Sequence, residues 1–212
     1  MSSMTDPTST HSPTGRPDRA GRLRLSATDL ALVASFAALI GALSYIGAVP
    51  VGGSGVPITL QTLGLGLTGA LLGPWRGFAA ATLYLALGAI GLPVFAEHSG
   101  GLGSFSKISA GYLISYPFAA LVIGLLVAFV AGQAGKTRAL VLFACTFVGG
   151  VLVVHAFGIV GMKVHQDVSW ATAAGWDAPF WIGDTLKTAI VALVAAEVHR
   201  AFPQLLPARR AR

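Results

Sequence analysis

The sequence predicts an all-α integral membrane protein with six transmembrane helices. Hydrophobic residues make up 54% of its 212 residues and charged residues only 10%, whereas soluble domains carry about 25% charged residues. The mean hydropathy is +0.74. Apolar runs long enough to cross a bilayer, at ~1.5 Å of helix per residue, alternate with segments rich in glycine, proline or charge. Together these observations exclude an ordinary soluble domain.

The expected membrane domain covers residues 26–202, and the apolar runs place its spans. The six spans cover about 28–46, 58–72, 78–92, 111–131, 140–160 and 180–198. Segments 47–57 and 73–77, rich in glycine and proline, separate the first three spans. Polar loops are expected over 93–108 and 161–179. A loop as long as 93–108 is typical of a lid or a binding segment, with a plain connector as the alternative.

Both ends of the chain are expected to be basic cytosolic tails. Residues 1–25 hold almost no large apolar side chain, which predicts disorder, and no apolar stretch of a signal peptide follows the first Met. Residues 203–212 end in a cluster of arginines. Eleven of the 14 Lys and Arg residues fall on the side of the termini, two fall on the other side, and Lys187 lies within a span. Because positive residues concentrate on the cytosolic side, both termini are predicted to be cytosolic.

The last span carries an acidic and a basic residue three positions apart, Asp184 and Lys187. On a helix they lie on one face. Charged groups at membrane depth are costly, so they are usually paired and functional. The alternative is a structural ion pair that holds the last helix against its neighbours. In the predicted orientation the pair and Tyr112 lie on the outer side, which predicts a pocket open to the outside.

Three further features of the spans have two interpretations each. Thr59, Gln61 and Thr62, at the start of the short second span, suit a neutral polar ligand, or hydrogen bonds to neighbouring helices. A lone His155 in the fifth span is interpreted as a hydrogen-bonded packing residue rather than a proton shuttle. Small residues at fourfold spacing in the first span predict close helix packing, within this chain or against a partner. They include Ala31, Ala34, Ala38 and Ala42.

Two stretches have the letters of nucleotide-binding motifs without the context that such motifs need. Gly64–Gly69 spells GxGxxG, but it lies inside a span with no strand before it. Gly135–Thr137 has the ending of a Walker A loop, but Val130 stands where the first glycine is required. We therefore expect no nucleotide site in this chain, and no cofactor, metal or nucleic-acid site is predicted.

Motifs along the membrane region resemble the BioY family, the biotin-specific substrate-binding (S) components of energy-coupling-factor (ECF) transporters. The matching stretches, in family order, are Val56–Thr62, Gly69–Pro74, Leu83–Leu85, Leu87–Ala96, Gly111–Leu113 and Pro179–Lys187. The most specific are Leu-Gly-Ala-Ile-Gly-Leu-Pro-Val-Phe-Ala and the Gly-Asp-x-x-Lys ending. One departure is Lys107-Ile-Ser-Ala-Gly-Tyr112, where the family usually has a Gly-Pro-Thr-Gly-Gly-Tyr-like stretch. Without that Gly and Pro the resemblance does not predict the shape of the third loop, and Lys107 is a candidate for an added carboxylate contact.

The resemblance implies an S-component fold of six helices in a bacterial cytoplasmic membrane, with biotin bound near the outer surface. It also implies docking onto a transmembrane coupling subunit that works with two ATP-binding-cassette ATPases. The alanines of the first span resemble the small-residue face that S components use for this docking. Because ATP hydrolysis then belongs to the partners, this chain itself is not expected to be an enzyme.

Biotin offers two N–H donors and a carbonyl on its ureido ring, a thioether ring and a carboxylate. In the resulting hypothesis Asp184 accepts a ureido N–H, and Lys187 donates to the ureido oxygen or orients Asp184. Thr59, Gln61, Tyr84 and Tyr112 add polar contacts or shape, while Phe95 and Trp181 cover the bicyclic ring. The alternatives are a standalone biotin carrier and a membrane-embedded enzyme that uses Asp184, Lys187 and His155. The enzyme is disfavoured because no nucleophile–base pair or metal motif is present.

Overall fold

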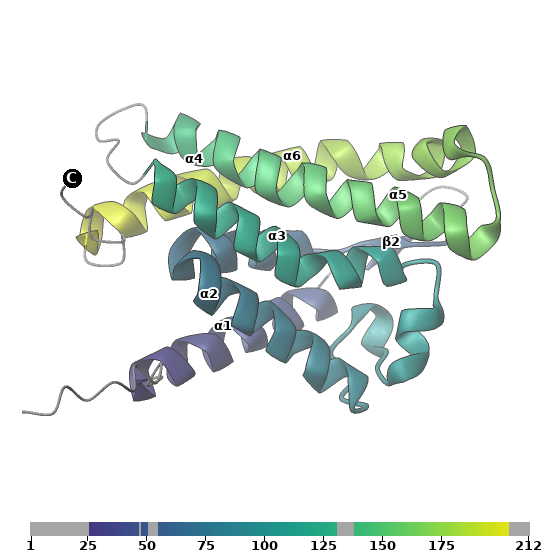
Figure 1. The fold of residues 1–212 in the computed structure, drawn as a ribbon, viewed down its shortest axis with the longest axis horizontal. Coiled ribbons are helices and arrows are strands. Elements are labelled where there is room, and N and C mark those ends of the chain that lie inside the picture. The colour runs from purple at the N-terminus through teal and green to yellow at the C-terminus, as the bar shows by residue number, and fades with distance from the viewer. Residues whose placement is uncertain (1–25, 47, 51–54, 131–137, 204–212) are drawn as a thin grey trace, which may run out of the picture.

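The described residues form an elongated bundle of helices, here seen in a computed structural model (Figure 1). The structure describes residues 26–46, 48–50, 55–130 and 138–203, so the two predicted tails lie outside it, apart from Pro203. The helices are α1 (Ala27–Tyr45), α2 (Gln61–Ala89), α3 (Ala110–Phe129), α4 (Arg138–Thr146), α5 (Val153–Gln166) and α6 (Trp170–Ala201). Strands β1 (Val49–Pro50) and β2 (Pro57–Ile58) pair antiparallel in a short hairpin. The predicted all-α class is confirmed for these residues, apart from the hairpin.

Helix α2 contains two of the expected spans and is interrupted between them at Gly73. The backbone there has φ 75° and ψ −174°, a conformation that glycine adopts without steric cost. Pro74 follows and has no backbone N–H to continue the helix. The two halves then run side by side, since a β-carbon on Gly77 would lie 3.3 Å from the Cα of Gly69. The chain therefore reverses direction in the segment predicted to be a tight turn.

Helices α4 and α5 are joined without a break by the π-helical segment η3 (Phe147–Leu152). This segment lies against α3, where a β-carbon on Gly149 would be 2.6 Å from the backbone nitrogen of Ile123. By length and composition, four helices of the described chain can cross a membrane: Ala27–Tyr45, Ala110–Phe129, Arg138–Gln166 and Trp170–Ala201. The first half of α2, Gln61–Leu72, is a shorter apolar helix.

The predicted loop over 161–179 is wrong in extent. Helix α5 continues to Gln166, and α6 begins at Trp170, about ten residues earlier than expected. The break is short because Asp167 takes a left-handed conformation that ends α5, and the side chain of Ser169 caps α6 by accepting a hydrogen bond from the N–H of Thr172. Most of the residues predicted to form a solvated loop are therefore helical, and some of them face the neighbouring helices.

The two ends of the bundle differ in what they contain. The start of α1, the reversal in α2 and the end of α6 lie at one end, on the left of Figure 1, where Arg76 and Asp29 form an ion pair. The hairpin, the connection from α2 to α3 and the turn between α5 and α6 gather at the other end. The α2–α3 connection contains two 3-10 turns, η1 (Ala96–His98) and η2 (Leu102–Ser106). This second end contains the cavity.

Candidate functional site

A cavity of about 340 Å³ lies among the hairpin, the α2–α3 connection, the facing ends of α3 and α5, and the middle of α6. Its size is within the range of small-molecule sites. Its inner wall includes polar side chains from the start of α2, from α3 and from α6. The lining residues include Thr59, Gln61, Thr62, Phe95, Ser104, Lys107, Tyr112, His165, Asp184 and Lys187.

Asp184 and Lys187 form the predicted pair and face the start of α2. Lys187 Nζ lies 2.7 Å from Asp184 Oδ1, and only 7% of Asp184 and 8% of Lys187 is exposed. The ammonium also donates to the backbone carbonyl of Thr59 and to Thr62 Oγ1, at 2.5 and 3.2 Å. Thr62 in turn donates to Asp184 Oδ1 at 2.9 Å. The pair therefore joins α6 to the start of α2 and lines the cavity at the same time.

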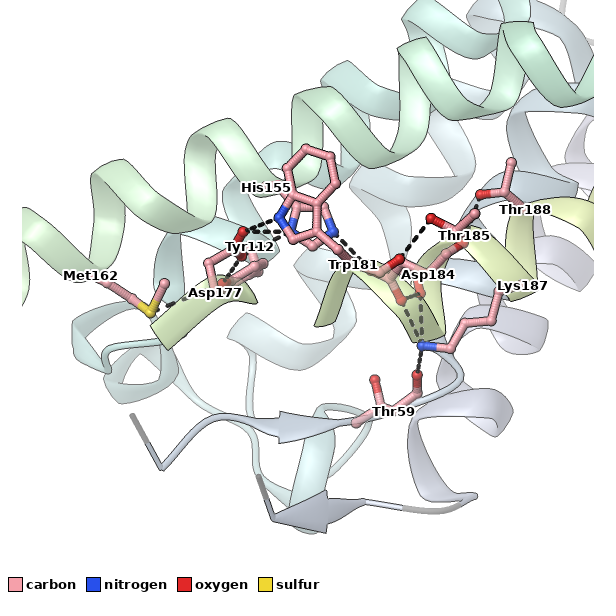
Figure 2. Close-up of polar contacts among 11 residues, drawn as sticks. Thr59, Tyr112, His155, Met162, Asp177, Trp181, Asp184, Thr185, Lys187 and Thr188 are labelled. Carbon is pink, nitrogen blue, oxygen red and sulfur yellow. Dashed lines mark hydrogen bonds and ion pairs between the residues drawn. The ribbon is translucent and has the colours of Figure 1, made fainter. Parts of the chain in front are cut away.

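The buried charges continue beyond this pair, as Figure 2 shows. His155 Nε2 lies 3.4 Å from Asp184 Oδ2, and its Nδ1 lies 2.8 Å from both carboxylate oxygens of Asp177. Asp177 also accepts hydrogen bonds from the hydroxyl of Tyr112, at 2.6 Å, and from the indole N–H of Trp181, at 2.7 Å. Each of these groups comes from α3, α5 or α6, so the network holds the three helices together behind the cavity wall.

A second polar group surrounds Gln61. Its amide N–H donates to Tyr84 at 2.6 Å, and its carbonyl oxygen accepts from Thr59 at 2.8 Å. Tyr84 donates onward to the backbone carbonyl of Val94 at 3.1 Å. The ring of Phe95 meets Tyr84 edge-on, with ring centroids 5.4 Å apart. These contacts fix the position of the α2–α3 connection against the bundle.

The structure brings most of the predicted site residues to the cavity. Thr59, Gln61, Tyr112, Phe95, Asp184 and Lys187 line it. Two do not. Tyr84 is buried behind Gln61 as a supporting residue, and Trp181 faces His155, with ring centroids 4.8 Å apart. Trp181 therefore does not cover the cavity as predicted, because it lies on the part of α6 that faces α5.

Sequence reasoning missed Asp177, which is fully buried in the network. It was assigned to the loop over 161–179, where a carboxylate needs no partner. One signal was present: Asp177 and Asp184 are seven residues apart, so two turns of helix place them on one face. Using it required extending the last helix past Pro179. The expectation that His155 is a hydrogen-bonded packing residue agrees with its contacts to Asp177.

The alanines predicted for docking all lie on the outside of the bundle. Ala31, Ala34, Ala38 and Ala42 are exposed along α1, and the described part of the chain leaves them without a cover. Among the same described residues, no group of three or more His, Cys, Asp or Glu side chains is placed to hold a metal ion.

Comparison with known proteins decides the family. A sequence model of the BioY family matches residues 16–204. The chain belongs to the BioY family. Among its relatives, the biotin transporter BioY of Rhodobacter capsulatus is 41% identical over 196 residues, which cover 85% of this chain and 98% of that protein. The biotin transporter BioY of Rhizobium etli is 37% identical over 187 residues, covering 87% of this chain and 100% of that protein.

A solved structure agrees with the BioY assignment. The crystal structure of the S-component for biotin from an ECF-type ABC transporter superposes with a TM-score of 0.77 and 27% identity, covering 82% of this chain and 91% of that one. The resemblance inferred from the motifs is therefore confirmed. The apolar helices and the transporter relatives identify the chain as a membrane protein of the BioY family.

Proposed function

We propose that this protein binds biotin in its cavity and serves as the S component of an ECF-type biotin uptake system. The observation that carries the proposal is the Asp184–Lys187 pair, which is nearly buried yet lines the cavity. Its support is the family, whose named relatives are biotin transporters. A transporter of this kind is not an enzyme, and ATP hydrolysis belongs to separate subunits.

The hydrogen bonds around Asp184 assign a role to each member of the pair. Lys187 has three N–H donors, and the contacts to Thr59, Thr62 and Asp184 occupy all three. Asp184 Oδ1 already accepts from Lys187 and Thr62. Oδ2 is the oxygen with acceptor capacity left, so it accepts a ureido N–H of biotin. Of the two roles considered for Lys187, these contacts favour the orientation of Asp184 over direct donation to the ureido oxygen.

Other lining groups suit the rest of the ligand. Gln61 retains one amide N–H beyond its bond to Tyr84, which can donate to the ureido oxygen. Ser104 is 3% exposed, and its hydroxyl has no hydrogen-bond partner among the described residues. Lys107 and His165 line the cavity as well, and the ammonium group of Lys107 attracts the carboxylate of biotin. Phe95 supplies an apolar surface for the bicyclic ring.

We also propose how the protein sits in the membrane and meets its partners. Six helical segments span the bacterial cytoplasmic membrane, with both termini in the cytosol and the cavity facing outward, in keeping with the distribution of Lys and Arg. The exposed alanine face of α1 packs against a transmembrane coupling subunit, because small residues allow close helix contact. That subunit joins the S component to two ATP-binding-cassette ATPases.

The experiment that tests this function is equilibrium binding of biotin to the full chain purified in detergent. We expect tight, nearly stoichiometric binding. No binding by folded protein that carries no co-purified biotin would reject the substrate. Uptake of labelled biotin, with and without coupling and ATPase subunits in the same cells, then separates the S component from a standalone carrier. Uptake without these subunits would reject the requirement for an ATPase module.

A further inference from the structure

The fully buried carboxylate of Asp177 is surrounded by donors. The indole of Trp181 can only donate, so Asp177 Oδ2 must accept its hydrogen bond. The hydroxyl of Tyr112 lies 2.6 Å from Oδ1, and His155 Nδ1 lies 2.8 Å from both oxygens. This environment suits an ionised carboxylate. An ionised carboxylate with 0% exposure needs a cation beside it, because an unpaired buried charge is strongly destabilising.

His155 is the group in position to supply that charge. Lys187 is bound to Asp184 and to the start of α2, and makes no contact with Asp177 among those described. The Nδ1–H of His155 donates to Asp177, which leaves Nε2 facing Asp184 Oδ2 at 3.4 Å. A neutral imidazole would direct the lone pair of Nε2 at this carboxylate, an unfavourable contact. A proton on Nε2 makes the same contact attractive.

Counting charges leads to the same protonation state. The cluster holds two carboxylates, Asp177 and Asp184, and one permanent cation, Lys187. With a neutral His155 it has a net negative charge inside the bundle, whereas an imidazolium makes it neutral. Tyr112, the other ionisable group of this network, donates to Asp177 and adds no charge, and Trp181, whose ring packs against the imidazole, carries none.

We infer that His155 carries a proton on both ring nitrogens and acts, with Asp177, as a positioning residue for the ligand-binding carboxylate Asp184. Asp177 fixes the ring through Nδ1, and the charge at Nε2 holds Asp184 Oδ2 toward α5. Oδ2 has no hydrogen bond from the described residues in this state, so it is oriented and still able to accept one from the ligand. The positioning role rests on the proposed function, whereas the protonation state does not.

The first test is a direct observation of the protons. The protein is labelled with ¹⁵N in its histidine rings, and His11, His98 and His165 are replaced by Gln, which leaves the two buried histidines, His155 and His199. Nitrogen NMR at neutral pH should show two protonated ring nitrogens for His155. His199, equally buried, makes no ion pair with a carboxylate among those described, and serves as the control with one protonated nitrogen. A single protonated nitrogen on His155 would overturn the inference.

The second test uses charge balance in a pair of variants. His155→Gln keeps a donor and an acceptor but leaves Asp177 without its cation, and we expect it to weaken biotin binding roughly ten- to hundredfold. Adding Asp177→Asn removes the unbalanced charge, because an amide replaces the carboxylate. The two introduced amides can still hydrogen-bond to each other, and the amide at position 155 can still donate to Asp184. The double variant should therefore bind biotin more tightly than His155→Gln alone, and His199→Gln should leave affinity unchanged.

The comparison separates positioning by charge from simple packing. If His155 only fills space, the two substitutions add, and the double variant binds no better than His155→Gln. That result would overturn the positioning role. Failure of the unsubstituted protein to bind biotin would instead reject the proposed ligand and leave the NMR test of the imidazolium intact. If His155→Gln does not fold, the NMR measurement on the histidine-reduced protein still decides the charge.

Discussion

The hydroxyl of Thr62 donates a hydrogen bond to Asp184 across 122 positions of sequence, at a distance of 2.9 Å. The same hydroxyl oxygen accepts from Lys187 at 3.2 Å, so one threonine completes a closed group of three side chains. Through this contact the ion pair of α6 is also bonded to α2, and the two helices together form this part of the cavity wall. Replacing the members of the group one at a time separates ligand binding from structural support.

Removing the charge of Asp184 should weaken binding more than it weakens folding. In Asp184→Asn the oxygen that accepts the ureido N–H is no longer ionised. A charge-assisted hydrogen bond contributes about 1.5–3 kcal/mol, so biotin affinity should fall roughly ten- to hundredfold, measured by calorimetry in detergent. Glu197→Gln, at an exposed carboxylate on the same helix, is the control and should bind normally. Normal affinity in the folded Asp184→Asn protein, with only a lower melting temperature, would mean that the pair is structural.

Thr62→Val keeps the shape of the side chain and removes its hydroxyl. Asp184 Oδ1 and Lys187 each lose one hydrogen bond, worth about 0.5–1.5 kcal/mol, so affinity should fall about two- to tenfold in the same binding assay. Thr82→Val is the matched control, because the exposed hydroxyl of Thr82 donates only to the carbonyl of Phe78 one turn earlier. Equal affinity for both variants would show that Thr62 does not orient the pair.

Gly88→Ala should disturb the cavity through Phe95. A β-carbon on Gly88 would lie 2.0 Å from Cζ of the Phe95 ring, and this ring lines the cavity while being almost fully buried. Overpacking of this kind costs about 1–3 kcal/mol, more than the gain of about 1 kcal/mol for alanine over glycine in a helix. Both the melting temperature and the biotin affinity should fall. Gly175→Ala, where no atom lies within 4 Å of the new carbon, should retain both, and an unaffected Gly88→Ala protein would show that Phe95 has room to move.

Larger side chains on the outer face of α1 should block coupling without affecting capture. Ala34→Leu and Ala38→Leu add bulk at exposed positions where a partner helix is proposed to approach closely. We expect normal biotin binding by the purified chain but reduced ATP-dependent uptake and reduced co-purification with the coupling subunit. Ala156→Leu, at an exposed alanine of α5, is the control. Unchanged uptake in the α1 variants would move the docking surface elsewhere.

Lys107 should distinguish biotin from ligands that lack the negative charge of the biotin carboxylate. It lines the cavity and is exposed, so a contact with the carboxylate of biotin is worth about 0.2–1 kcal/mol and weakens with salt. Lys107→Gln should lower the affinity for biotin up to about fivefold and leave the affinity for biotin methyl ester unchanged. Lys163→Gln, whose ammonium lies over the ring of Trp170, is the control. Parallel losses for both ligands in Lys107→Gln would exclude a carboxylate contact.

The errors in the sequence analysis share one cause. The loop predicted over 161–179 treated Asp177 as solvated, and the role assigned to Trp181 treated its ring as an apolar cover for the ligand, so both predictions left out hydrogen-bond partners. In the fold, Asp177 and Trp181 bind each other one helical turn apart, and their partners are His155 and Tyr112 from other helices. A hydrogen-bond partner on another helix leaves no trace in the local pattern, so polarity alone predicted solvent contact.

Local sequence was sufficient for the membrane class, the helical architecture and the choice of Asp184 and Lys187 as the central pair. Hydropathy and glycine–proline breaks act over a few residues, and the cost of a charge in an apolar run depends little on the rest of the fold. Tertiary structure alone set three features: the cavity, the contacts of Thr62 with both members of the pair, and the extension of the network through His155 to Asp177. Those features depend on how α2, α3, α5 and α6 approach one another, because buried charges are stabilised by partners that only packing brings within hydrogen-bond distance.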